Sequence, residues 1–193
     1  MSGVKQFDED AALSKALELF WQQGYGATSM PDLARKTGVL RGSLYNAYGG
    51  KEGLFLRAFE RYRDAMLEDI GGALAHKDPR RALERFFQFT IGSMTTGTPS
   101  RGCLTTKTAF DEGRDSELVR RELQGLLDKI ETALVQRLSE PQARSRLTLE
   151  PVDAARLILT FTRGVVVMER VYGDKARLAR AAASLVDLLM PQP

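Results

Sequence analysis

An early stretch of the chain, GVLRGSLYNAYGGKEGLF over residues 38–55, combines side chains that can contact nucleic acid. Arginine can hydrogen-bond guanine O6 and N7 or a phosphate, and asparagine can bind the edge of adenine. Hydroxyl and ammonium groups contact phosphate oxygens. The candidate DNA-contacting residues in this stretch are Arg41, Ser43, Tyr45, Asn46, Tyr48 and Lys51.

A glycine at position 42 strengthens this interpretation. Glycine costs about 0.5–1 kcal/mol relative to alanine inside a helix, yet Gly42 falls within a short predicted helix. A residue without a side chain is useful where a backbone must approach another molecule closely. We therefore add Gly42 to the candidate DNA-contacting residues.

The positive charge of the chain is small but concentrated around this stretch. The 193 residues hold 28 Lys and Arg against 25 Asp and Glu, a net charge of +3. Between residues 28 and 51, four basic residues stand against Asp32 alone, so the local excess equals that of the whole chain. This indicates a phosphate-facing surface, with an ordinary solvated surface as the alternative. The four are Arg35, Lys36, Arg41 and Lys51.

Composition argues against several other classes of protein. A single cysteine excludes an internal disulfide framework, and a single histidine, His76, argues against a protein-built zinc or haem site. No apolar run approaches the roughly 18–20 residues of a membrane span. The first ten residues, MSGVKQFDED, lack the apolar core of a secretory signal. We expect a cytoplasmic protein without metal or cofactor.

Apolar periodicity predicts an all-α fold of about nine helices. Even the run Val165–Val167 lies within a helical pattern, so no strand is expected. Residues 95–102 (TTGTPSRG) read as a loop, and residues 141–151 as a linker. The expected helices cover residues 7–25, 29–37, 40–47, 51–70, 79–94, 103–110, 116–138, 152–172 and 174–190.

The second and third expected helices form a helix-turn-helix over about residues 29–48. Both are short, and the turn Thr37-Gly38-Val39 contains a glycine, as is typical of this motif. The later helix would present its first turns to base edges. Free N–H groups at a helix start bind anions, so Thr28 and Ser29, which open the earlier helix, are also candidate phosphate contacts.

Residues 28–55, TSMPDLARKTGVLRGSLYNAYGGKEGLF, resemble the signature of TetR-type regulators. That signature runs approximately T-S/T-x-x-x-I/L-A-x-x-A-G-V-S-x-G-S-L-Y-x-H-F-x-S-K-E-x-L. The matching positions are Thr28, Ser29, Leu33, Ala34, Gly38, Val39, Gly42, Ser43, Leu44, Tyr45, Lys51, Glu52 and Leu54.

The chain departs from this signature at several positions. Leu40 replaces a serine that would cap the recognition helix, and Val39–Leu40 could pack instead. Ala47 replaces a histidine and removes a phosphate donor. Tyr48 stands for phenylalanine, and Gly50 for a serine. We expect these changes to alter the preferred DNA sequence without abolishing binding.

The resemblance implies two domains, a DNA-binding domain over residues 6–66 and a ligand-binding and dimerisation domain over residues 67–193. It further implies a repressor, less often an activator, that binds a palindromic double-stranded DNA operator as a homodimer and is released by a small molecule. The last two helices would form a four-helix interface with a second subunit, with simple intramolecular core as the alternative. The expected interface residues are Leu157, Phe161, Val165, Leu178 and Leu185.

Cys103 is the second candidate site. It opens a short helix with Arg101 before it and Lys107 one turn later, and a helix N-terminus and nearby cations favour a thiolate. Gly-Cys-Leu resembles a branch of the family in which some members sense electrophiles or oxidants through this cysteine. The alternative is a small buried hydrophobe.

The effector itself cannot be read from the sequence beyond a small apolar or electrophilic molecule. A protein partner is an alternative to a small ligand. An enzyme using Cys103 as nucleophile would need a base, and the single His76 stands in no catalytic constellation, so we expect no catalytic activity. Aromatic and methionine residues could line an effector pocket or form plain core. The expected lining is Phe86, Phe110, Phe161 and Met168.

Overall fold

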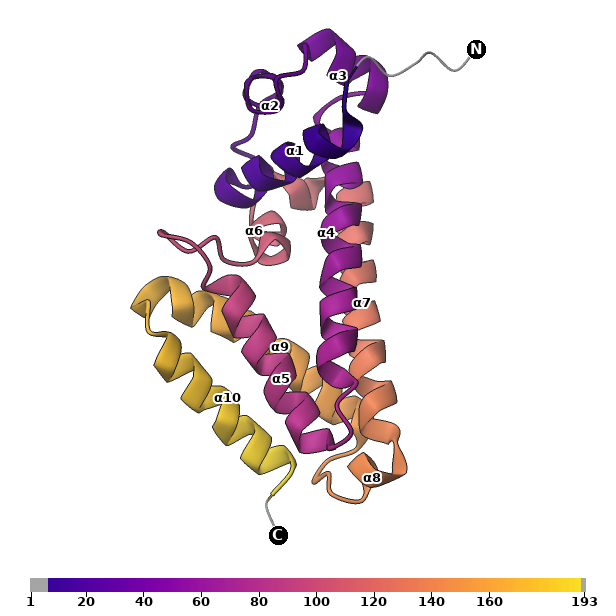
Figure 1. The fold of residues 1–193 in the computed structure, drawn as a ribbon, viewed down its shortest axis with the longest axis vertical. Coiled ribbons are helices and arrows are strands. Elements are labelled where there is room, and N and C mark those ends of the chain that lie inside the picture. Colours follow the sequence, from indigo (N-terminus) through magenta and orange to yellow (C-terminus); the bar gives the residue numbers. More distant parts are fainter. Residues whose placement is uncertain (1–6, 192–193) are drawn as a thin grey trace. The chain divides into compact units, whose positions relative to one another are not determined.

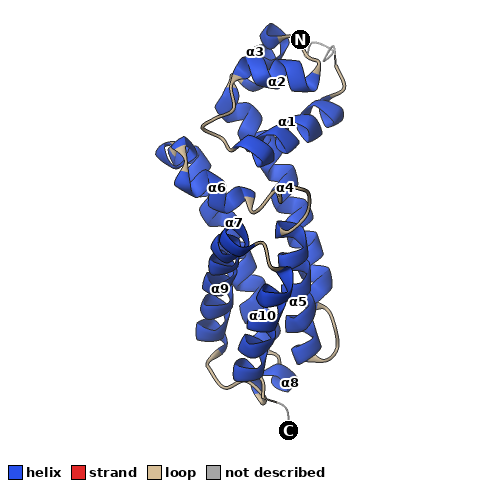
Figure 2. Cartoon of the chain, turned by 90° about the vertical axis from the view of Figure 1, so that its left-hand side faces the viewer, coloured by secondary structure: helices blue, strands red, loops and turns tan. Residues whose placement is uncertain are grey.

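A computed structural model describes residues 7–191, apart from the side chain of Arg114. Over this range the chain forms ten α-helices and one short 3-10 helix and contains no strand (Figures 1 and 2). The prediction of an all-α fold is therefore confirmed. The helices are α1 Glu9–Gln23, α2 Met30–Thr37, α3 Arg41–Tyr48, α4 Lys51–Leu74, α5 Pro79–Met94, α6 Leu104–Phe110, η1 Glu112–Asp115, α7 Glu117–Ser139, α8 Pro141–Arg144, α9 Pro151–Tyr172 and α10 Lys175–Leu189.

Two helices differ from the prediction. The stretch expected to be a linker begins with the short helix α8. Helix α4 continues through Gly71–Gly72 to Leu74. A side chain of α7 stabilises this end by donating hydrogen bonds to the carbonyl groups there. The buried Arg137 donates its Nε–H to the Leu74 carbonyl over 3.0 Å, and Nη2 donates to the carbonyl of His76 over 2.9 Å. A guanidinium thus stabilises this helix end where the glycines alone would predict a break.

The chain divides into two compact units. Unit 1 comprises the chain up to Asp64 together with Leu104–Leu123, and unit 2 comprises Ala65–Cys103 together with the chain from Gln124 onward. Both α4 and α7 contribute to both units. The first boundary lies close to the predicted one at residue 66. However, α6, η1 and the start of α7, which the sequence placed in the second domain, pack with the first.

Unit 1 has a core to which each of its first four helices contributes a fully buried leucine. An aromatic cluster extends this core, with the ring of Phe55 5.0 Å from those of Phe20 and Tyr25 and 5.6 Å from that of Phe59. Burial of large apolar side chains stabilises the unit by about 1.5–3 kcal/mol each. The leucines are Leu13, Leu33, Leu44 and Leu54.

Unit 2 is a helical bundle in which α5 packs against α9 and α10. Arg80, in the first turn of α5, donates to the Met190 carbonyl over 2.7 Å and pairs with Asp187, so α5 begins where α10 ends. The N–H of Thr148 donates to the Leu189 carbonyl over 3.0 Å, which places the start of α9 at the same end.

Candidate nucleic-acid interface

Local capping defines the helix-turn-helix. Ser29 is the N-cap of α2, and its Oγ accepts from the Asp32 N–H while the Asp32 carboxylate accepts from the Ser29 N–H. This reciprocal arrangement is a capping box, which stabilises the start of α2. The hydrogen bonds from Ser29 and Arg35 lower the pKa of Asp32. Gly38 ends α2 in the left-handed conformation (φ 76°), and Leu40 precedes α3.

Helix α3 buries one face in unit 1 and exposes the opposite one. Leu44 is completely buried and fastens the helix to the core. The exposed face carries no acidic residue, which suits it to a polyanion. Ser43 is half-buried. The exposed residues of the helix and its N-cap are Leu40, Arg41, Gly42, Tyr45, Asn46 and Ala47.

Gly42 differs from the other glycines near α3. Gly38 and Gly49 have φ of 76° and 77° and end helices in a conformation that favours glycine. Gly53 is excluded from carrying a side chain because a Cβ would lie 1.9 Å from the Tyr48 carbonyl oxygen. Gly42 has helical geometry, and a Cβ there would meet nothing within 4 Å. No contact within residues 7–191 therefore requires a glycine at this position.

Three of the expected DNA contacts are structural groups in unit 1. The Thr28 side chain is buried and donates to the Gly24 carbonyl over 2.6 Å. The Lys51 ammonium donates to the Tyr25 carbonyl over 3.1 Å and lies 4.4 Å from the centre of that ring. The Tyr48 hydroxyl is buried, and this burial raises its pKa. These side-chain groups are hydrogen-bonded or buried within unit 1, and DNA contacts at the three positions stay predictions.

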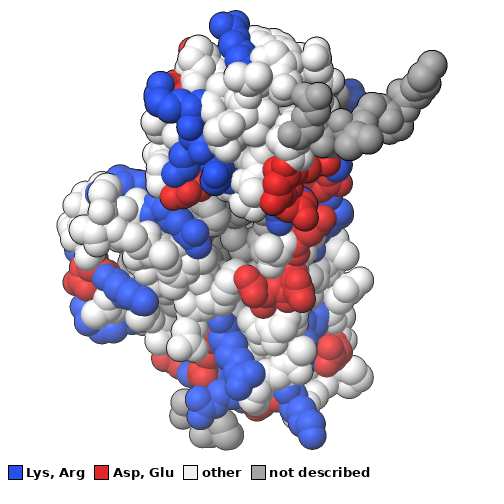
Figure 3. Space-filling view, turned by 45° about the horizontal axis from the view of Figure 1, so that its top comes forward, with Lys and Arg blue, Asp and Glu red and all other residues white. Residues whose placement is uncertain are grey.

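The basic surface therefore rests on fewer residues than the sequence suggested. Lys36 pairs with Glu18 over 2.9 Å, and Arg35 pairs with Asp32. Arg41 has no carboxylate partner among residues 7–191, and its guanidinium carbon lies 5.4 Å from the Tyr45 ring centre. Figure 3 shows acidic side chains lying beside basic ones at several places on this face of the molecule. On α3 itself, Arg41 is the cation available to DNA.

Lys107, an expected effector contact, has a structural role in unit 1. Its ammonium donates to the carbonyl oxygens of Trp21 over 2.6 Å and Gln22 over 3.3 Å, at the end of α1. Nearby, Asp111 accepts from the Gly26 N–H over 3.0 Å. The contacts of α6 and of the residue that follows it thus hold the end of α1 and the turn that leads to α2.

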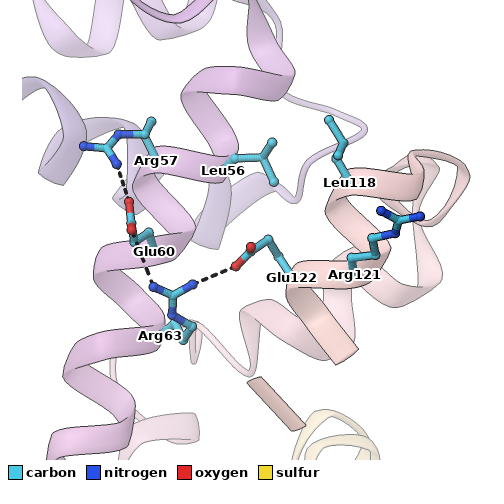
Figure 4. A pocket seen from close by; sticks show the side chains of 7 residues that line it. All are labelled: Leu56, Arg57, Glu60, Arg63, Leu118, Arg121 and Glu122. Atoms are coloured by element: carbon cyan, nitrogen blue, oxygen red, sulfur yellow. Dashed lines mark hydrogen bonds and ion pairs between the residues drawn. The ribbon is translucent and has the colours of Figure 1, made fainter. Parts of the chain in front are cut away.

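A second set of contacts ties α4 to α7 within unit 1. A hollow of about 240 Å³ lies between the two helices, with Leu56 on one side and Leu118 on the other (Figure 4). Arg63 pairs with Glu122 over 2.8 Å and with Glu60 over 3.6 Å. Hydrogen bonds to Asp64 and Glu122 raise the pKa of Arg63. The sequence did not point to the Arg63–Glu122 pair, because its two residues are 59 positions apart.

Cys103 has a cationic neighbour that the sequence did not indicate. The thiol is buried, and the Arg163 Nη1 on α9 lies 3.5 Å from its Sγ. The same guanidinium donates to the Thr162 hydroxyl over 3.0 Å. The sequence suggested Arg101 and Lys107 instead, because only neighbours along the chain can be recognised there.

The residues expected to line one effector pocket do not gather into a single site within either unit. Phe86 belongs to the core of unit 2, where the Phe161 ring lies 5.6 Å from that of Phe87. Met168 is exposed on α9. Phe110 belongs to unit 1 and is 79% exposed. Of the four, Phe86 and Phe161 both lie beside the Phe87 ring, at 5.4 and 5.6 Å.

The residues expected at a dimer interface fall into two groups. Val165, Leu178 and Leu185 are buried within one protomer, so they are core residues, and their assignment to an interface is corrected. Leu157 is exposed and Phe161 half-buried. The exposed large apolar residues of α9 and α10 are Val152, Leu157, Val167, Met168, Val171, Tyr172 and Leu188.

The described part of the chain contains neither a membrane-spanning helix nor a cluster of metal-ligating side chains. No helix there combines the length and the apolar character that a membrane span needs. No group of three or more His, Cys, Asp or Glu side chains is placed to hold a metal ion within residues 7–191.

Comparison with known proteins decides the family. Residues 12–58 match the model of bacterial regulatory proteins of the tetR family, and residues 79–185 match that of a tetracyclin repressor-like C-terminal domain. The chain belongs to the TetR family. The predicted family is confirmed, whereas the branch suggested by Gly-Cys-Leu stays a prediction.

Several relatives of this TetR-family chain are similar over nearly its whole length. The transcriptional repressor ComR of Escherichia coli K12 is 34% identical over 188 residues, which covers 95% of this chain and 90% of ComR. The uncharacterised regulator YezE of Bacillus subtilis 168 is 27% identical and covers 81% of each chain. A cysteine mutant of the TetR-family regulator CifR, solved with 26-base-pair operator DNA, has a TM-score of 0.84 and 26% identity, covering 94% of this chain and 96% of that one.

Proposed function

We propose that this TetR-family protein is a repressor that binds a palindromic double-stranded DNA operator as a homodimer through α3 and is released by a small effector. The observation that carries this proposal is the exposed, acid-free face of α3, where Gly42 has open space around it and Arg41 lacks a carboxylate partner within residues 7–191. The relatives support the same activity, since ComR is a repressor and CifR was solved with operator DNA.

The chemistry of this face suits the major groove. Arg41 can donate to guanine O6 and N7, and Asn46 can bind adenine N6 and N7. Tyr45 offers a hydroxyl to a phosphate, while the lack of a side chain at Gly42 allows the backbone to approach. A single available cation on each α3 gives a modest electrostatic contribution, so tight binding requires two copies.

The exposed apolar side chains of α9 supply a surface for the second copy. Leu157, Phe161 and Met168 recur at spacings of four and seven residues and therefore share one face of the helix. A two-fold dimer would place two α3 helices on half-sites about 34–36 Å apart. An effector that changes this spacing lowers affinity, because both helices can no longer dock together.

The experiment is a footprint on the DNA upstream of the protein's own gene, followed by affinity measurements at several salt concentrations. Arg41→Ala should weaken binding to the protected sequence about 5- to 150-fold per half-site and reduce its salt dependence. Arg81→Ala, at an exposed arginine of α5, is the matched control and should bind as the wild type does. An Arg41→Ala protein with undiminished affinity would contradict the proposed role of α3.

The Arg163 contact supports a second candidate, in which modification of Cys103 triggers release. A guanidinium beside the sulfur favours the thiolate, which is the nucleophilic form. Cys103→Ser should keep DNA binding and lose release by a thiol-reactive compound. Unchanged release in this variant would exclude the candidate.

A ligand-induced rise in melting temperature would distinguish a small effector from a protein partner.

A further inference from the structure

Leu40 is unusual for the residue that precedes a recognition helix. It occupies the N-cap of α3, with φ −56° and ψ 138°, and makes no side-chain capping hydrogen bond. A serine, threonine, aspartate or asparagine there would stabilise the helix. Its side chain is 79% exposed, so the expected alternative, packing of Leu40 within the protein, is wrong. Leu40 thus gives up a cap without burying its side chain in the core.

The glycines on either side of Leu40 leave open space next to it. The two nearest glycines along the chain are Gly38, two residues before it, and Gly42, two residues after it. At both of these a Cβ would meet nothing within 4 Å. Arg41 follows it directly and is exposed. Leu40 is therefore an apolar projection on the first turn of α3, flanked by backbone that another molecule can approach.

The major groove offers one apolar group on the edges of its bases. Guanine, cytosine and adenine present only donors and acceptors there, whereas thymine adds a C5-methyl group. A leucine cannot form hydrogen bonds, so a methyl is the base feature that it can recognise. Burying the methyl and the leucine against each other removes apolar surface from water.

We propose that Leu40 reads a thymine in each half of the operator by packing against its C5-methyl group. This inference rests on the proposed function, in which α3 enters the major groove. It makes Leu40 a determinant of sequence preference at a position where the family signature has a serine. Single exposed apolar residues are common on protein surfaces, so the test must show that the contact depends on the methyl itself.

The test is a double-mutant cycle between Leu40 and the methyl group. The probes are the footprinted duplex and duplexes in which one thymine of each half-site is replaced by deoxyuridine, which lacks only the methyl. At one symmetric pair of positions, the replacement should weaken wild-type binding about fourfold per half-site, or about 15-fold for the dimer. Leu40→Ala should bind the natural duplex more weakly. It should lose the sensitivity to deoxyuridine only at that symmetric pair of positions.

Leu40→Ser provides the matched variant. Serine restores a cap to α3, so this protein should be at least as stable as the wild type and yet insensitive to deoxyuridine. A loss of discrimination in a more stable protein cannot come from misfolding. If both variants respond to every deoxyuridine as the wild type does, the inference is overturned.

The two proposals fail in different ways. If no sequence is protected, or Arg41→Ala binds as tightly as the wild type, the proposed role of α3 fails and the Leu40 contact fails with it. If the footprint and the Arg41 effect are present but no thymine methyl couples to Leu40, only the present inference is overturned.

Discussion

The ammonium of Lys107 on α6 donates a 2.6 Å hydrogen bond to the carbonyl oxygen of Trp21 in the last turn of α1. The last carbonyls of a helix have no partner within it and form the negative end of its dipole. The last turn of α1 contains no basic residue of its own. A lysine more than 80 positions away therefore completes the end of α1.

Replacing Lys107 with methionine should lower the free energy of unfolding by about 1–2 kcal/mol, because charge-assisted hydrogen bonds to the carbonyls at the end of α1 are lost. It should also weaken DNA binding, since α1 packs directly against α2. Urea unfolding and operator affinity measure the two effects. Lys129→Met, at an exposed lysine of α7, is the control. Equal stability of the two variants would show that the end of α1 does not depend on Lys107.

Gly42→Ala should separate stability from DNA binding. The added methyl meets nothing within 4 Å, so the free energy of unfolding should rise by about 0.5–1 kcal/mol through improved helix propensity. Operator affinity should fall at least tenfold, because the methyl occupies the space that DNA would approach. Thermal unfolding and a binding isotherm on the same preparation measure the two changes. A stabilised variant with normal affinity would contradict close approach at this position.

Gly53→Ala is the contrasting substitution. Its Cβ would lie 1.9 Å from the Tyr48 carbonyl oxygen, so the start of α4 would have to shift. This variant should lose both stability and binding together, which distinguishes a packing glycine from one that faces DNA.

The periodic features of this protein were predictable from its sequence, whereas its long-range contacts were not. The capping box at Ser29, the turn at Gly38 and the exposed Arg41 follow from local spacing, and all appear in the structure. Lys51 and Lys107 carry the correct charge for a ligand contact. Their ammonium groups instead donate hydrogen bonds to carbonyl groups 26 and 86 positions away along the chain. No local sequence pattern shows such contacts.

The amphipathic pattern also could not separate buried from exposed apolar residues in α9 and α10. Val165 and Leu157 both fit one apolar stripe, but only the structure shows that the former is buried and the latter exposed. Similarly, the low helix propensity of Gly71 and Gly72 predicted that α4 would end before them. The tertiary contacts of Arg137 outweigh that preference.

Asp78 should make stability depend on acid pH. It caps α5, accepting from the Arg81 N–H over 2.8 Å and from Arg146 over 2.8 Å, and these hydrogen bonds lower its pKa. Because the pKa is lower in the folded than in the unfolded chain, this contribution is complete above the ordinary aspartate value of about 4. It is lost as the pH falls through the lowered value.

Asp78→Asn can still cap the helix but cannot pair with Arg146. Its free energy of unfolding should therefore be lower than that of the wild type at pH 7, and the difference should shrink on acidification to pH 3. Urea titrations at the two pH values measure this convergence. Asp128→Asn, at an exposed aspartate of α7, is the control and should run parallel to the wild type. A difference for Asp78→Asn that stays constant with pH would contradict the role of its charge.

Glu169 should be a site where stability can be gained. Its side chain lies on the inner face of α9, 7% exposed, and its Oε2 is buried without a hydrogen-bond partner among the described residues. Leaving a buried polar atom unpaired costs about 1–3 kcal/mol. Glu169→Met keeps a similar length without polar atoms, so it should raise the free energy of unfolding by an amount in that range. Urea titration at matched protein concentration measures this change.

Glu68→Met, at an exposed glutamate of α4, is the control and should change the free energy of unfolding little. A Glu169→Met protein less stable than the wild type would mean that the carboxylate is satisfied in solution, and the cost assigned to it would be wrong.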